Sequence, residues 1–146
     1  MAAILITLLV VALGITAFIR FAPSDPADWH VDPLTVTKPG KPNNWLIRDG
    51  GDAPAVILPD TPDQVMAKLD AIARADPRTI LLAGEGFHKT WITRSARMAY
   101  PDYTSVRLEP SGKGTKLSLF ARSRFGASDF GVNRARAEKW LAQLAR

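Results

Sequence analysis

The sequence predicts an α+β domain, an antiparallel β-sheet packed by two helices, preceded by one N-terminal transmembrane helix. Three observations predict this class. An uncharged apolar stretch covers residues 2–19. Two later segments space their apolar residues by three and four, as amphipathic helices do. Short strand-like runs separated by turns fill the chain between these two segments. With 146 residues and a net charge of +5, one soluble domain is the natural count.

The apolar stretch is long enough to cross a bilayer. As a helix, residues 2–19 would extend about 27 Å, close to the hydrocarbon thickness of about 30 Å. The alternative is a cleaved signal peptide, but Met1 is followed directly by apolar residues with no basic region, and no small-x-small cleavage site precedes Pro23. We therefore expect residues 1–20 to anchor the chain, as a single-pass protein, in the cell inner membrane.

The side of the membrane stays open. Arg20, Lys38 and Lys41 follow the span, and positive charge next to a span favours a cytoplasmic domain. A bacterial signal anchor, however, usually exports the domain that follows it. The two arguments conflict.

Residues 21–42 are predicted to form a proline-rich stalk that leads into the domain at residues 43–146. The stalk contains Pro23, Pro26, Pro33, Pro39 and Pro42. This spacing is expected to forbid a helix and to favour extended or turn conformations. Because Trp29, Val31 and Leu34 are unusually apolar for a free linker, we expect the stalk to lie against the domain.

Two helices are expected in the domain, together with an entry strand at the end of the stalk and six further strands. The first helix begins at Asp60-Thr61-Pro62, where Asp or Thr caps it, and ends at Asp76-Pro77. The second helix covers residues 133–144 and begins at Asn133. Strands are expected at residues 45–48, 55–58, 79–83, 89–94, 104–109 and 116–124, with turns at Pro101-Asp102 and at residues 111–114. The last two strands pair naturally as an antiparallel hairpin.

Composition excludes several kinds of site. The chain has no Cys and only two His, His30 and His88, which excludes a disulfide framework, a thiolate nucleophile and a cysteine or multi-histidine metal site. Gly84-Glu85-Gly86 lacks the following helix and lysine of a phosphate loop, so a turn is expected there. We expect neither a metal nor a cofactor.

Charge is distributed unevenly along the chain. Residues 20–85 hold 7 basic and 10 acidic side chains, whereas residues 86–146 hold 12 basic and 4 acidic ones. A surplus of +8 in the second half exceeds the −3 of the first, so positive surface should remain for an anion. Nucleic acid is not favoured as the partner, because the aromatic residues of this half fall mostly at expected core positions.

The segment at residues 121–134, ARSRFGASDFGVNR, joins the last strand to the last helix. Strand alternation places Arg122 and Arg124 on one face. Arg107 and Arg94 are expected on the same face if the sheet follows chain order, which would make an arginine cluster. Asp129 is the nearest internal acceptor for bidentate hydrogen bonds from Arg122, Arg124 or Arg134.

The helix start adds a second indication. Asn133 suits a helix cap, but Arg134 and Arg136 then fall in the first turn, where the helix dipole disfavours cations. An external phosphate or carboxylate is an alternative to Asp129 as the compensating anion. A purely structural lattice around the corner is a third interpretation. The candidate ligand-binding residues are Arg94, Arg107, Arg122, Ser123, Arg124, Asp129, Asn133 and Arg134.

These residues favour a non-enzymatic, membrane-anchored domain. It would present an arginine-rich strand–helix corner to an anionic ligand, a lipid headgroup or a partner protein. The alternative is an enzyme that uses Asp129 or Asp102 while clustered arginines hold a small anionic substrate. Catalysis is the weaker hypothesis, because no pair of carboxylates has a spacing that specifies acid and base roles.

Two stretches carry a family resemblance. TRSARMAYPDY at residues 93–103 and SRFGASDFGVNR at residues 123–134, with Arg122 leading, resemble the bacterial and plastid family called domain of unknown function 1499. Where members tend to have Tyr-Ser at the strand, this chain has Ala121-Arg122. The stretch APSDPADWHVDP is similar to that of small membrane-anchored bacterial members. The resemblance covers the chain from about Pro26 to Leu144 and implies a shared domain without an assigned activity.

Overall fold

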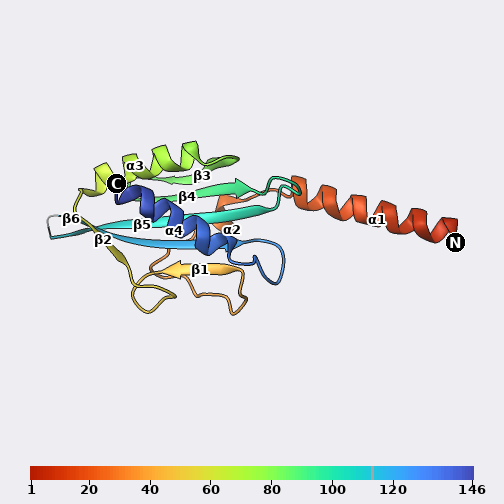
Figure 1. Cartoon of the computed structure of the whole chain (residues 1–146), viewed down its shortest axis with the longest axis horizontal. Helices are drawn as coiled ribbons and strands as arrows, with labels where there is room; N and C mark the ends of the chain where they lie inside the picture. The colour runs from red at the N-terminus through yellow and green to blue at the C-terminus, as the bar shows by residue number, and fades with distance from the viewer. Residues whose placement is uncertain (113) are drawn as a thin grey trace.

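The computed structural model describes residues 1–112 and 114–146. A six-stranded antiparallel sheet has the order β1-β6-β5-β4-β3, and β2 pairs with β6 beside β1 (Figure 1). The strands are β1 Asn44–Ile47, β2 Val56–Leu58, β3 Thr79–Glu85, β4 His88–Arg94, β5 Pro101–Ser111 and β6 Gly114–Ser123. The predicted α+β class and the β5–β6 hairpin are confirmed. The turn expected at residues 111–114 includes Lys113, which lies outside the described residues.

One expected turn is a strand. Pro101-Asp102 forms the start of β5. Pro101 pairs with Arg94 of β4, and Asp102 pairs with Thr93 of β4 on one side and with Ser123 of β6 on the other. Proline is tolerated at the first position of a strand, because that position need not donate to the ladder. The longer strand brings Asp102 into the domain interior.

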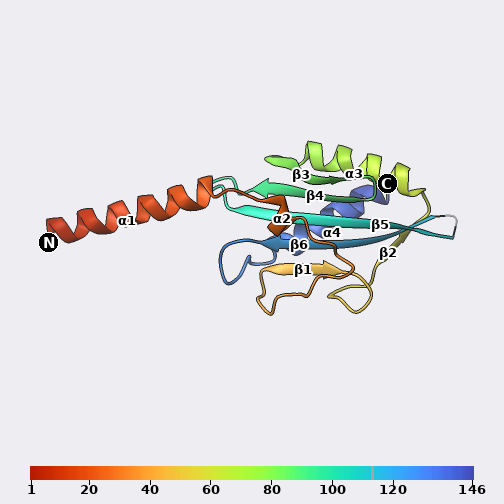
Figure 2. The same cartoon turned by 180° about the vertical axis from the view of Figure 1, so that it is seen from behind.

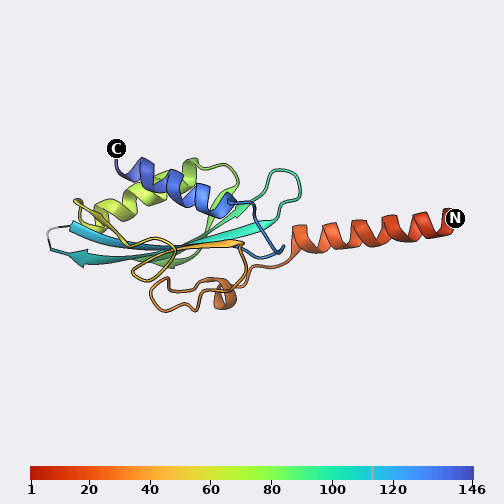
Figure 3. The same ribbon diagram turned by 60° about the horizontal axis from the view of Figure 1, so that its bottom comes forward.

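Two helices, α3 (Pro62–Ala75) and α4 (Val132–Leu144), cover one face of the sheet (Figure 3). Thr61 caps α3 in a reciprocal pair with Gln64, and Pro62 stands at the first turn. The predicted apolar stripe is buried at Val65, Met66, Leu69 and Ala73.

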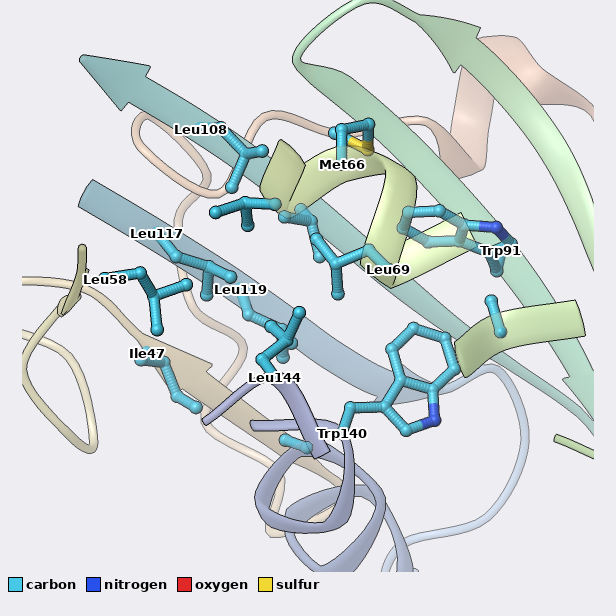
Figure 4. Packing of buried hydrophobic residues seen from close by; sticks show 14 of the residues in the cluster. Ile47, Leu58, Met66, Leu69, Trp91, Leu108, Leu117, Leu119, Trp140 and Leu144 are labelled. Atoms are coloured by element: carbon cyan, nitrogen blue, oxygen red, sulfur yellow. The ribbon is translucent and has the colours of Figure 1, made fainter. Parts of the chain in front are cut away.

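The hydrophobic core fills the space between these helices and the sheet. Trp91 of β4 and Trp140 of α4 meet edge to face, with ring centroids 5.6 Å apart (Figure 4). Leu69, Leu117 and Leu119 belong to the same cluster and are fully buried (Figure 4). The space between the helices and this face of the sheet is therefore packed from the middle of the sheet to the end that carries the β5–β6 hairpin.

The opposite face of the sheet is covered by residues 22–36, which we call the strap (Figure 3). Trp29 stacks on Tyr103 of β5, with ring centroids 4.2 Å apart. His30 Nδ1 lies 2.8 Å from Thr90 Oγ1, and His88 Nε2 lies 3.1 Å from the Val31 carbonyl. The stalk thus lies against the sheet, as expected, but the entry strand expected at its end does not form, since the first strand begins at Asn44.

The prediction that prolines forbid a helix in this segment was wrong. Residues Pro26–Trp29 form a short helix, α2. Asp25 accepts a hydrogen bond from the Ala27 N–H, and Pro26 occupies the first position, where no N–H is required.

Helix α1 (Ala2–Phe21) is long and apolar enough to span a membrane. It projects away from the domain, and the β5–β6 hairpin lies at the opposite end (Figures 1 and 2). The last turn of α1 packs against the domain: Ile19 is buried, and the ring centroids of Phe18 and Phe125 are 6.1 Å apart. The end of the domain that carries residues 95–100 and 124–131 therefore adjoins the end of α1.

Candidate functional site

A polar network lies under the N-terminal end of α4, on the face of the sheet that α3 and α4 cover. Ser123 Oγ donates to Asp102 Oδ1 at 2.7 Å, and Arg136 of α4 donates to Asp102 Oδ2 at 3.2 Å. Asp102 is 7% exposed. Burial raises the pKa of its carboxyl, although the hydrogen bond from Ser123 and the charge of Arg136 oppose this shift.

Asn133 connects the members of this network. Its side chain is fully buried, and Nδ2 lies 2.9 Å from Ser123 Oγ and 2.7 Å from Asp129 Oδ2. Its Oδ1 accepts a hydrogen bond from Arg136 at 3.2 Å. We call Asp102, Ser123, Asp129, Asn133 and Arg136 the corner network. It ties two strands, the connecting loop and α4 together.

The structure corrects two expectations about Asp129 and Asn133. Asp129 accepts hydrogen bonds from the backbone N–H groups of Gly131 and Asn133, at 3.0 and 2.8 Å, and from the Asn133 side chain, rather than from the arginines. Gly131, in the left-handed conformation, precedes α4 as its cap, and Asn133 lies inside the helix. The Gly131 turn brings the Asp129 carboxylate onto the first turn of α4, where negative charge is favourable.

A cavity of about 530 Å³ opens beside the corner network, and we call it the corner cavity. Its apolar lining includes Ile19 of α1, Phe125 and Val132. Its polar lining includes Asp102, Ser123 and Asp129. Large, mostly apolar cavities with a few convergent polar groups are the usual form of ligand sites.

Arg122 lies on the opposite face, beneath the strap. It is 6% exposed and donates to Ser105 Oγ and the Phe120 carbonyl, both at 3.1 Å, and to the Trp29 carbonyl. Burial lowers the pKa of the Arg122 guanidinium to about 10. Strand alternation predicted this face correctly, but the strap keeps Arg122 from solvent.

The other candidate arginines have separate partners. Arg124 donates to the Pro23 carbonyl at 2.6 Å, and Arg94 donates to the carbonyls of Arg20 and Ala99, each at 3.1 Å. Arg107 Nε lies 4.0 Å from Asp32 Oδ2 of the strap, and Arg134 pairs with Glu138 at 2.7 Å. Several of the candidate arginines therefore fasten the strap and the end of α1 to the sheet. Only Ser123, Asp129 and Asn133 of the candidate set share the corner network.

Three arginines line a second cavity at the same end of the domain. Arg20 of α1, Arg78 before β3 and Arg94 of β4 line about 300 Å³, which we call the arginine cavity. Arg78 Nε donates to the Arg94 carbonyl at 3.0 Å. Within residues 1–112 and 114–146, none of these three guanidiniums has a carboxylate oxygen within 4.0 Å.

Sequence reasoning missed several of these residues. No pattern in the sequence marks Arg78. It reaches the arginine cavity only because of the turn after α3, in which it has a positive φ of 60°. Arg136 was noted only as an unfavourable charge in the first turn of α4. Its pairing with Asp102 follows from the β5–β6 register, which places Asp102 opposite Ser123. In the part of the chain that the structure describes, no group of three His, Asp or Glu residues is placed to hold a metal ion.

The comparisons with known proteins agree with the resemblance carried by residues 93–103 and 123–134. No curated protein matches the chain. The model of the family described as protein of unknown function (DUF1499) matches residues 24–144, which include most of the strap, the sheet, α3 and all of α4. The chain therefore belongs to the domain of unknown function 1499 family.

Proposed function

We propose that the chain is a single-pass inner-membrane protein whose domain binds an anionic lipid headgroup at the bilayer surface. In this proposal α1 is retained as the membrane anchor. Its packing supports retention, because Ile19 and Ala22 are buried and Arg94 donates to the Arg20 carbonyl. Cleavage of a signal peptide before Pro23 would remove each of these contacts.

The position of the arginine cavity also supports the proposal. A helix of 20 residues is about 30 Å long, which matches the hydrocarbon thickness of a bilayer. Arg20, in the last turn of α1, then lies at the membrane–water boundary. Arg78 and Arg94 line the same cavity, so their charges lie at the level of the lipid headgroups.

The observation that carries the proposal is the convergence of these three charges, with no carboxylate oxygen within 4.0 Å of them among the described residues. Like charges that line one cavity raise one another's free energy, and a bound anion relieves this repulsion. Guanidiniums donate paired, charge-assisted hydrogen bonds to phosphate oxygens. A phosphate headgroup thus fits the arginine cavity in charge and in hydrogen bonding. The class of ligand is the one expected from the sequence, but of the candidate residues only Arg94 lines this cavity, and Arg20 and Arg78 are not among them.

The enzymatic alternative has one supporting feature, the buried Asp102 beside the corner cavity. A carboxyl with a raised pKa in a cavity suits a general acid. However, both oxygens of Asp102 accept hydrogen bonds from within the corner network, and those of Asp129 accept hydrogen bonds from Asn133 and from the Gly131 N–H. Their geometry suits a structural or binding role, so binding is the function that we propose.

Native mass spectrometry of the full chain tests the proposal. The protein is transferred from dodecyl maltoside micelles with phosphatidylglycerol or with phosphatidylcholine, and bound lipids are counted. We expect tighter binding of phosphatidylglycerol. Since a hydrogen bond to a charged group contributes about 1.5–3 kcal/mol, Arg78→Gln should weaken that binding by roughly tenfold or more.

The matched control is Arg74→Gln. Arg74 is also exposed, but it lies on α3 and does not line the arginine cavity. It should leave lipid binding unchanged. Equal binding of the two lipids, or equal effects of the two substitutions, would overturn the proposal and direct the search to a protein partner.

A further inference from the structure

We infer that the corner cavity is a second binding site, for an amphiphile that carries an ammonium group on an apolar chain. It differs from the arginine cavity in charge, in lining and in the elements that build it. The inference uses the proposed membrane anchor for the route of entry but not for the chemistry of the site.

The size and shape of the corner cavity fit such a ligand. Its volume of about 530 Å³ lies within the range of about 300–1,000 Å³ that is typical of ligand sites. Its lining comes from the end of α1, the loop between β4 and β5, the start of β5, the end of β6 with the loop before α4, and the first residue of α4. The α1 part of this lining, Ile19, is in place only when the end of α1 is docked against the domain.

The charge of the lining favours a cation. Asp102 and Asp129 line the corner cavity, and its lining includes neither lysine nor arginine. Arg136 compensates Asp102 from the α4 side at 3.2 Å. Among the described residues, no lysine, arginine or histidine nitrogen lies within 4.0 Å of the Asp129 carboxylate. The Asp129 carboxylate at the cavity wall thus accepts hydrogen bonds from the first turn of α4 but has no side-chain cation beside it among the described residues.

The electrostatics of Asp102 agree with this assignment. Burial is the main cause of its raised pKa, and the charge of Asp129 adds to the shift. The second effect reflects negative charge beside Asp102, while the hydrogen bond from Ser123 and the charge of Arg136 oppose the shift. An ammonium group in the corner cavity would relieve both carboxylates, whereas a phosphate or carboxylate ligand would be repelled.

The apolar lining accounts for the chain of the amphiphile. Ile19, Phe125 and Val132 form one wall of the cavity. Phe130 lines the same cavity and is 95% exposed. Single exposed apolar residues are common, but here Phe130 and the half-exposed Val132 adjoin the end of α1, whose apolar side chains are also exposed. With α1 in a bilayer, an amphiphile enters with its chain along α1 and its head toward Asp129.

Thermal unfolding of the full chain in dodecyl maltoside micelles tests this inference. The probes are dodecylamine, dodecanol and dodecanoate, which share one chain and differ in head-group charge. We expect dodecylamine at saturating concentration to raise the Tm by about 5 °C, and the other two probes to raise it by much less. A Tm that rises equally with dodecylamine and dodecanol, or with none of the probes, would overturn the inference.

Two substitutions localise the effect. Val132→Trp fills the cavity from a half-exposed position without touching the corner network, and it should abolish the shift. Asp129→Asn removes the carboxylate charge while keeping an acceptor oxygen, and it should weaken dodecylamine binding by roughly tenfold. The control Asp63→Asn, an exposed carboxylate on α3, should keep the full shift. A shift that survives Val132→Trp would place the amine elsewhere and refute the inference.

The failure of this inference is distinguishable from the failure of the proposed function. Arg78→Gln should leave the dodecylamine shift unchanged, because Arg78 does not line the corner cavity. Val132→Trp should leave phosphatidylglycerol binding unchanged, because Val132 does not line the arginine cavity.

Discussion

Replacing the buried Asn133 by alanine should strongly destabilise the domain. The substitution removes the hydrogen bonds of Nδ2 to Ser123 Oγ at 2.9 Å and to Asp129 Oδ2 at 2.7 Å. It also removes the acceptor for Arg136 at 3.2 Å. A neutral hydrogen bond contributes about 1 kcal/mol and one to a charged group about 1.5–3 kcal/mol. Alanine recovers about 0.5 kcal/mol of helix propensity, so we expect a net loss of roughly 3.5–6.5 kcal/mol.

Urea unfolding of the full chain in micelles measures this loss through tryptophan emission. All four tryptophans lie outside α1, so the signal reports the domain. Arg134→Ala, one residue further along α4, is the control: Arg134 is largely exposed and its ion pair with Glu138 lies at the surface, so the change should cost less than about 1 kcal/mol. If Asn133→Ala cost no more than Arg134→Ala, the corner network would not hold the end of α4, and the reasoning would be refuted.

Three further predictions concern the strap and two titrating groups. Arg122→Met should speed amide hydrogen exchange in residues 22–36 with little loss of global stability, because it replaces a buried cation by an apolar group; unchanged exchange would show that Arg122 does not hold the strap. Burial, the neighbouring His88 and the charge of Arg122 together lower the pKa of His30 below 6.5, against the opposing charge of Asp32. As the pH falls, the unfolded chain therefore protonates His30 before the folded chain does, and the free energy of unfolding should fall as the pH falls from about 7.5 through the folded-state pKa. In urea titrations, His30→Gln should flatten this dependence of the unfolding free energy on pH, and an unaltered dependence would contradict the prediction. Burial opposes ionisation of Asp76, but hydrogen bonds from Lys139 and Trp140 lower the pKa of its carboxyl below 3.8. The stability that ionised Asp76 contributes to the fold should be present above pH 3.8 and lost on further acidification. Asp76→Asn should remove this acid-dependent part of the stability, and equal acid sensitivity of the unsubstituted chain and the variant would exclude this role.

Local signals in the sequence were sufficient for most elements of the fold. Thr61, Pro62 and the apolar spacing located α3 because the cap, the first-turn proline and the buried stripe all act within one helix. Alternation placed Arg122 on the correct face of β6. Pro101-Asp102 was assigned to a turn because this residue pair favours turns, and pairing with β4 and β6 overrides that preference.

The site was less accessible to sequence reasoning, because its contacts join distant segments. The burial of Arg122 depends on the strap, which returns across the sheet to place the Trp29 carbonyl at the guanidinium. Arg20, Arg78 and Arg94 meet only after α1, the turn before β3 and β4 converge. Asp129 was correctly singled out as an internal anion, but its partners are backbone N–H groups that a left-handed Gly131 presents. No local pattern specifies these encounters.

The most direct test of the account is the depth of the α1-adjacent end of the domain in a bilayer. The chain has no cysteine, so a single spin label can be attached through Phe130→Cys, or through Ser111→Cys at the opposite end. In vesicles of phosphatidylglycerol and phosphatidylcholine, power-saturation measurements compare collisions of each label with oxygen and with a water-soluble nickel complex. The account predicts that the label at position 130 lies at the membrane–water boundary and that the label at position 111 lies in water. Equal, water-like collision rates at both positions would contradict it.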